Sequence, residues 1–124
     1  MPKKGYKMTI EHKNKIPTEY EEACVLAEWL TLKGIKFSHI AQETFTRNWG
    51  TKMKNKRMGV NSGVPDYICI VNNHLIWIEL KRQKGGAVSP AQQSWIDALN
   101  ACKNCGAFVT KGADEAIAII NKYL

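Results

Sequence analysis

The feature that most constrains this chain is an expected hairpin near its middle. Two apolar segments rich in β-branched and aromatic residues, 64–71 and 74–80, flank the pair Asn72 and Asn73. Asparagine tolerates the positive φ angles that a two-residue hairpin turn requires. The sequence therefore predicts an antiparallel hairpin in which the residue numbers of every cross-strand pair add to 145.

That register gathers charged side chains at one end of the hairpin. Asp66 falls opposite Glu79, and Lys81 lies two residues further along on the same face, because side chains alternate along a strand. Opposed carboxylates are destabilising unless a cation offsets them. Two carboxylates are hard oxygen ligands that suit Mg²⁺ or Mn²⁺ together with water and substrate phosphate. The alternative is that Lys81 only neutralises Glu79 and that Asp66 caps a turn after Pro65.

Short motifs around these residues resemble a known nuclease signature. Pro65-Asp66 followed by Glu79-Leu80-Lys81 is similar to the PD-(D/E)xK motif. A longer match, over about residues 18 to 124, resembles the VRR-Nuc (virus-type replication-repair nuclease) branch, and it includes the segments Arg57-Met58-Gly59-Val60, Gly63-Val64-Pro65-Asp66 and Ser89-Pro90-Ala91-Gln92.

The resemblance assigns roles to individual residues of the expected site. It implies that Mg²⁺ or Mn²⁺ binds Asp66, Glu79 and the main-chain carbonyl of Leu80, and that Lys81 holds the attacking water and stabilises the transition state. It also implies that Gln92 helps to orient the site, although a solvated glutamine in the first turn of a helix is an equal alternative.

In this family the first helix commonly supplies a further acidic residue. Glu22 and Glu19 are the candidates, and Glu22 is preferred because its position beside Ala23 and one turn before Leu26 points it toward the packed side. The alternative is that both acids lie in the first turn only because the helix dipole stabilises negative charge there.

The remaining elements follow from capping and periodicity. Helices are expected over 18–33, 89–103 and 113–124 and further strands over 35–41 and 107–110, with Ile117, Ile120 and Leu124 facing inward in the last helix. A helical crossover favours parallel pairing of the final strand. The order α-β-β-β-α-β-α predicts an α/β domain with a mixed sheet flanked by helices, the restriction-endonuclease-like architecture.

Length and composition indicate one water-soluble domain. The chain has 124 residues, of which 44% are hydrophobic, and no apolar run approaches the roughly 20 residues that span a bilayer. The first residues lack the apolar core of a signal peptide, so a cytoplasmic location is expected, with no membrane partner. Cys24 and Cys69 sit in apolar runs and are expected to be buried, whereas Cys102 and Cys105 lack the second cysteine pair of a zinc site.

The net charge of +7 suggests a polyanionic partner. Residues 1–17 form a basic arm that precedes a domain over 18–124. A second basic cluster precedes the expected site in the sequence, and Lys84 follows the last residue of that site. The residues expected to contact DNA phosphates are Arg47, Lys54, Lys56, Arg57 and Lys84. Two nearby aromatic residues, Phe45 and Trp49, either stack on nucleic acid or cover the core.

These observations predict a metal-dependent nuclease that hydrolyses DNA phosphodiesters. The resemblance further implies products with a 5′-phosphate and a 3′-hydroxyl. Small stand-alone family members, typical of phages and bacteria, act as homodimers on branched DNA such as four-way (Holliday) junctions, which implies a role in DNA repair. Two alternatives remain: a catalytically silent DNA-binding module of the same fold, and a sequence-specific restriction enzyme.

Overall fold

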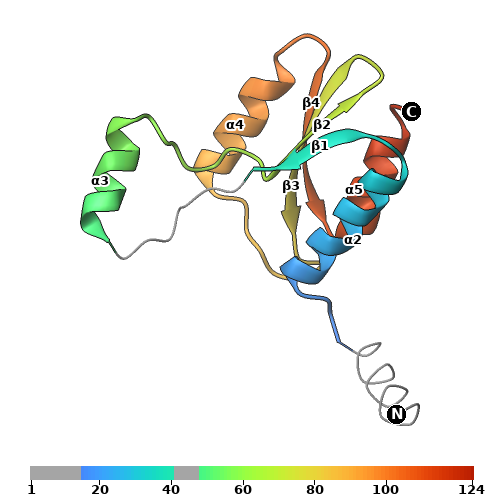
Figure 1. The fold of residues 1–124 in the computed structure, drawn as a ribbon, viewed down its shortest axis with the longest axis horizontal. Helices are drawn as coiled ribbons and strands as arrows, with labels where there is room; N and C mark the ends of the chain where they lie inside the picture. Colours follow the sequence, from blue (N-terminus) through green and yellow to red (C-terminus); the bar gives the residue numbers. More distant parts are fainter. Residues whose placement is uncertain (1–14, 41–47) are drawn as a thin grey trace.

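The computed structural model describes residues 15–40 and 48–124. Its helices and strands follow the chain in the order α2 (Glu19–Leu32), β1 (Lys36–His39), α3 (Trp49–Arg57), β2 (Tyr67–Val71), β3 (His74–Lys81), α4 (Pro90–Asn100), β4 (Cys105–Lys111) and α5 (Ala113–Asn121) (Figure 1). The predicted order is confirmed, with α3 as a short additional helix between β1 and β2. Thr18 and Ser89, which begin the predicted helix ranges 18–33 and 89–103, both form capping boxes, with Glu21 and Gln92.

The four strands form one sheet in the order β1-β2-β3-β4. The first three strands are antiparallel, and β4 runs parallel to β3 after the crossover through α4. The hairpin register is the predicted one, from Val71 paired with His74 to Tyr67 paired with Ile78. Asn72 and Asn73 have φ angles of 46° and 65°, as the expected turn requires.

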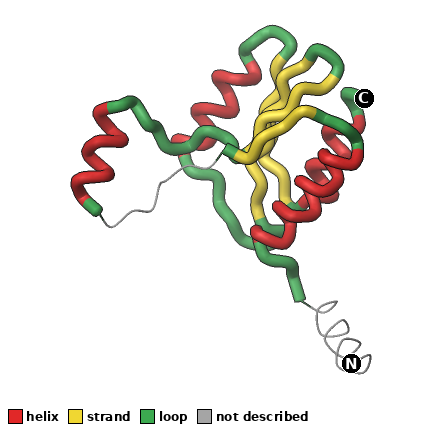
Figure 2. Tube along the Cα trace, in the orientation of Figure 1, coloured by secondary structure: helices red, strands yellow, loops and turns green. Residues whose placement is uncertain are grey.

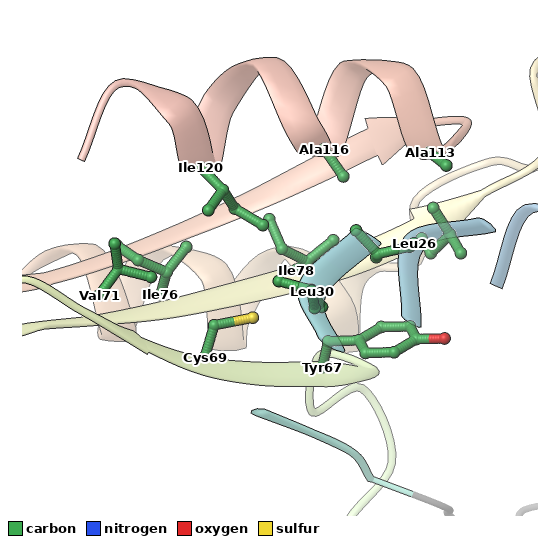
Figure 3. Close-up of a cluster of buried hydrophobic side chains, with 11 residues drawn as sticks. Leu26, Leu30, Tyr67, Cys69, Val71, Ile76, Ile78, Ala113, Ala116 and Ile120 are labelled. Carbon is green, nitrogen blue, oxygen red and sulfur yellow. The ribbon is translucent and has the colours of Figure 1, made fainter. Parts of the chain in front are cut away.

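Helices cover both faces of the sheet. Helices α2 and α5 lie together on one face and α4 lies on the other (Figure 2). The main core fills the space between the sheet and the α2/α5 layer, where the buried side chains of four elements point toward one another (Figure 3). These residues are Leu26, Leu30, Tyr67, Cys69, Val71, Ile76, Ile78, Leu80, Ala113, Ala116 and Ile120. The mixed sheet with helices on both faces is the predicted restriction-endonuclease-like architecture.

Helix α4 is tied to the last strand by polar contacts. The side chain of Asn100 accepts a hydrogen bond from the Ala107 main-chain N–H at 2.8 Å and donates one to the Ala107 carbonyl oxygen at 3.0 Å. Ile96 is buried beneath the same helix. These contacts anchor the end of α4 on β4, the strand that pairs with β3.

The predicted burial of two residues is wrong. Helix α5 ends at Asn121, so Leu124 lies beyond the helical stripe and is 56% exposed. Cys24 is exposed, because a residue two positions before the buried Leu26 faces the opposite side of a helix. Cys69 is buried as expected, and none of the cysteines forms a disulfide.

Helix α3 stands apart from the rest of the fold (Figure 1). None of its residues is buried, and Trp49 is 73% exposed, so this aromatic ring does not cover the core. Phe45 lies outside the described residues. None of the helices in residues 15–40 and 48–124 is both long enough and apolar enough to cross a membrane.

Candidate active site

Asp66 is held at the junction of three strands. It immediately precedes β2, and its main-chain carbonyl accepts a hydrogen bond from Ile40 N–H at 2.6 Å, just past the end of β1. Its carboxylate Oδ2 accepts a hydrogen bond from the Leu80 N–H of β3 at 3.1 Å. The carboxylate therefore takes the place that a backbone acceptor would hold if β2 began earlier.

Glu79 lies beside Asp66 on the face of the sheet that α4 covers. Only 4% of Glu79 is exposed. Its Oε2 accepts a hydrogen bond from Gln92 Nε2 at 3.0 Å, and the Lys81 ammonium lies 3.5 Å from the same oxygen. The structure therefore brings Glu79, Lys81 and Gln92 into direct contact at the end of β3.

The orientation of the Gln92 amide follows from its neighbours. Gln92 Oε1 accepts hydrogen bonds from Lys81 Nζ at 3.1 Å and from Ser89 N–H at 3.0 Å, and both of these groups are donors. The amide nitrogen must then face the Glu79 carboxylate, which is an acceptor. Gln92 thus caps its own helix and bridges the two charged residues of β3, and it is not a solvated glutamine.

Burial and repulsion by neighbouring carboxylates disfavour the charged form of both carboxyl groups. Burial, and then the negative charge of Asp66, raise the pKa of Glu79 to about 7, against the opposing effect of Lys81. Burial also raises the pKa of Asp66, while the Leu80 N–H lowers it and the charge of Glu19 raises it again. The ammonium of Lys81 only partly offsets the negative charge of the pair, which favours a further cation at this place.

The donor atoms fit a hard divalent cation that keeps water ligands. Within residues 15–40 and 48–124 no group of three or more His, Cys, Asp and Glu side chains is arranged to hold a metal ion. Two carboxylates are nevertheless adjacent, and the carbonyl of Leu80 points to the same side as its N–H, toward Asp66. An oxygen-only set of this size leaves positions for water and phosphate oxygens, as Mg²⁺ prefers.

Glu22 is buried, as predicted, but it does not join this cluster. Its Oε1 accepts a hydrogen bond from Ala113 N–H at 3.0 Å, and its Oε2 accepts one from Gln83 Nε2 at 2.9 Å. Glu22 therefore caps the first turn of α5 and ties it to the segment after β3. Gly112 permits this approach, because a Cβ there would lie 3.1 Å from Glu22 Oε2 at a φ of 86°.

Glu19 is the acid of the first helix that lies near the site. Its negative charge raises the pKa of both Asp66 and Glu79, and it lines a cavity together with Asp66. The two candidates share the first turn of α2, so sequence position did not separate them. What separates them is the N-terminus of α5, a partner for Glu22 that lies 91 residues away in the chain.

Gly63 is a positioning residue that the sequence indicates only as part of a motif segment. Its φ is 95°, and a Cβ at this position would lie 2.6 Å from the carbonyl carbon of Ala91 and 2.8 Å from the main-chain nitrogen of Gln92. The segment before Asp66 therefore packs directly on the first turn of α4. This close approach sets the distance between the two halves of the site.

The predicted DNA-contacting residues lie outside the carboxylate cluster. Lys54, Lys56 and Arg57 are exposed on the last turn of α3, and Lys84 is exposed in the loop after β3. Helix α3 carries four positive side chains and no acidic one. Arg47 lies outside the described residues.

Replacement of Gly63 should test the close approach to α4. We expect Gly63→Ala to lower the free energy of unfolding by at least about 1 kcal/mol more than Gly59→Ala, because overpacking adds to the backbone strain. Gly59 is the matched control, since its φ is 86° and a Cβ there meets nothing within 4 Å. Urea denaturation measures both variants, and equal losses would contradict the packing role of Gly63.

The raised pKa of Glu79 makes stability depend on pH. A carboxyl group whose pKa is higher in the folded chain stabilises the fold at low pH and loses that contribution as the pH rises from its ordinary value of 4.5 to about 7. The difference in the free energy of unfolding between Glu79→Gln and wild type should therefore shift by up to about 3 kcal/mol in favour of the variant as the pH rises from 4 to 8 in EDTA. Asp97→Asn, which changes an exposed carboxyl group of α4, is the control. Parallel profiles of unfolding free energy against pH for wild type and Glu79→Gln would contradict a raised pKa for Glu79.

The fold of this chain is similar to that of a known structure, and its sequence matches a family model. No curated protein matches the chain. A solved structure described as a "VRR_NUC domain protein" aligns with a TM-score of 0.72 and 29% sequence identity, covering 89% of this chain and 90% of that chain. The VRR-NUC domain matches residues 6–114, which include every residue of the carboxylate cluster. The chain belongs to the VRR-NUC domain family, a family of nucleases.

Proposed function

We propose that this protein is a metal-dependent deoxyribonuclease that hydrolyses phosphodiester bonds. The observation that supports this most strongly is the cluster in which Gln92 bridges Glu79 and Lys81, with the carboxylate of Asp66 fixed on the neighbouring residue of β3. In the proposal, Asp66, Glu79 and the carbonyl of Leu80 hold Mg²⁺ or Mn²⁺. The bound metal ion would lower the pKa of a water molecule and offset charge on the phosphate.

Each side chain of the cluster has a distinct task in this proposal. Lys81 is a donor held between Gln92 Oε1 and Glu79 Oε2, so it is placed to hold a water and to stabilise negative charge on the phosphate rather than to act as a general base. Gln92 is a positioning residue, because its amide fixes both Lys81 and Glu79. By family resemblance, the products carry a 5′-phosphate and a 3′-hydroxyl.

The exposed basic residues support binding to the DNA backbone. Lys54, Lys56 and Arg57 project from a helix that packs on none of the sheet, and Lys84 follows the strand that carries Glu79 and Lys81. In the proposal these residues contact phosphates on either side of the cleaved bond. Such contacts position the duplex without reading its sequence.

We propose branched DNA, such as a four-way junction, as the substrate. The described residues, 15–40 and 48–124, contain one carboxylate cluster with an adjacent lysine, and two opposed cuts across a junction need two such clusters. A two-fold homodimer supplies two equivalent sites. The family resemblance supports this arrangement for small stand-alone members.

A cleavage assay with matched variants tests the proposed chemistry. Wild type should cut four-way-junction DNA with Mg²⁺ or Mn²⁺, and Asp66→Asn and Lys81→Ala should each be slower by about 100-fold or more. Asp114→Asn and Lys122→Ala, exposed residues of the C-terminal segment, are controls that should cut normally. Flap and linear duplex DNA are compared in the same assay.

The other outcomes of this assay identify the alternatives. Tight binding of junction DNA without cutting would support a catalytically silent module. Cutting of linear duplex at one fixed sequence would support a restriction enzyme. Cutting by Asp66→Asn at the wild-type rate would show that Asp66 has no catalytic role.

The salt dependence of DNA binding tests the role of α3. Each lost phosphate contact should reduce the slope of log K against log salt by about 0.9. Replacement of Lys54, Lys56 and Arg57 by alanine should therefore reduce the slope by about 3 and leave the unfolding midpoint unchanged, because these side chains are exposed. The control replaces Lys33, Lys103 and Lys122, which are exposed elsewhere. An unchanged slope in the α3 variant would exclude this helix from the DNA contact.

A further inference from the structure

A cavity of about 470 Å³ lies next to Asp66 and is not used in the chemistry proposed above. It lies on the face of the sheet that α2 covers, because Tyr67 and Leu80 belong to the core on that face. Its volume is in the range of pockets that hold small organic ligands. Asp66 is shared by the cavity and by the carboxylate cluster, so any ligand in the cavity would lie beside the reacting phosphate.

The walls of this cavity are flat and largely apolar. The rings of Tyr67 and His39 stack nearly parallel, with centroids 4.5 Å apart and an interplanar angle of 12°. Ala23 and Ala27 line the α2 side, and their small side chains leave the space open. Tyr20, which is 77% exposed, lines the same cavity with a further aromatic ring.

Two acidic side chains lie among the polar groups of the cavity, which also include His39. Glu19 and Asp66 both line it. Carboxylates repel a bare phosphate but accept hydrogen bonds from neutral N–H and amino groups. The cavity thus suits a flat, neutral ring with hydrogen-bond donors at its edge.

We propose that this cavity binds one unpaired nucleobase of the DNA strand, next to the phosphodiester that is cut at the carboxylate cluster. This inference rests on the proposed nuclease function and names a substrate feature that the enzyme selects. A nucleobase presents a π-face to aromatic side chains and N–H groups to carboxylates. A base stacked in a regular duplex must first leave the helix, which costs free energy, whereas an unpaired base at a branch point enters at less cost. The cavity would therefore favour cleavage at branched or single-stranded positions.

Fluorescence of a base analogue tests occupancy of the cavity directly. Junction oligonucleotides carry 2-aminopurine at successive positions around the cut site, with Ca²⁺ in place of Mg²⁺, and anisotropy confirms that the DNA is bound. Emission should fall at one position in wild type, because the analogue stacks on an aromatic ring. Ala27→Met, which fills the cavity, and Tyr20→Ala, which removes an exposed ring, should each restore emission at that position. Ala118→Met, on an exposed position of α5, is the matched control and should behave as wild type.

An abasic nucleotide supplies the second measurement. At the quenched position it should weaken wild-type binding about fivefold or more, and it should change the binding of Ala27→Met by less than twofold. Thermal unfolding of Ala27→Met confirms that the variant is folded. The proposal would be overturned if the abasic nucleotide weakened binding equally in wild type and Ala27→Met. It would also be overturned if both cavity variants still quenched 2-aminopurine emission.

The design separates this inference from the nuclease proposal. Base-dependent binding by an enzyme that cuts no DNA with Mg²⁺ or Mn²⁺ would overturn the hydrolysis and leave the base site standing. Metal-dependent cutting at a rate indifferent to the abasic nucleotide and to Ala27→Met would overturn the base site alone. Absence of any binding to the oligonucleotides would overturn both.

Discussion

The carboxylate of Glu79 is buried at the end of an apolar hairpin, and the surrounding structure is arranged around its charge. Gln92 donates to it from α4 and Lys81 approaches it from two residues further along β3. Burial and the nearby negative charge of Asp66 work against both contacts and raise the pKa of Glu79 to about 7. A site with this imbalance stabilises the fold poorly on its own. It is well suited to a cation that arrives with its substrate.

Several distant contacts hold this cluster in place. The hairpin register brings Asp66 to the N–H of Leu80, and the crossover through α4 returns Gln92 to the end of β3. Gly63 lets the segment before Asp66 pack on the first turn of α4, while Glu22 ties α5 to the segment after β3. Substitution of these supporting residues would therefore alter the cleavage rate even though their side chains do not contact the substrate.

The sequence predicts the fold closely because its local signals agree with one another. The two asparagines set the hairpin register, and alternation then places Glu79 and Lys81 on one face. The crossover helix then adds Gln92 to this pair, whereas the preferred acid of the first helix, Glu22, lies outside the cluster. Glu22 binds a helix end 91 residues away, a partner that no local pattern could reveal. The roles of Gly63 and of the cavity beside Asp66 depend equally on contacts between distant segments.

Anomalous diffraction from a crystal soaked in Mn²⁺ shows most directly whether this cluster binds a metal ion. We expect a manganese peak within coordination distance of the carboxylates of Asp66 and Glu79 and of the main-chain oxygen of Leu80, with Lys81 and Gln92 still in contact. A crystal saturated with Mn²⁺ whose density shows no peak between these two carboxylates, or places the ion elsewhere, would contradict this expectation.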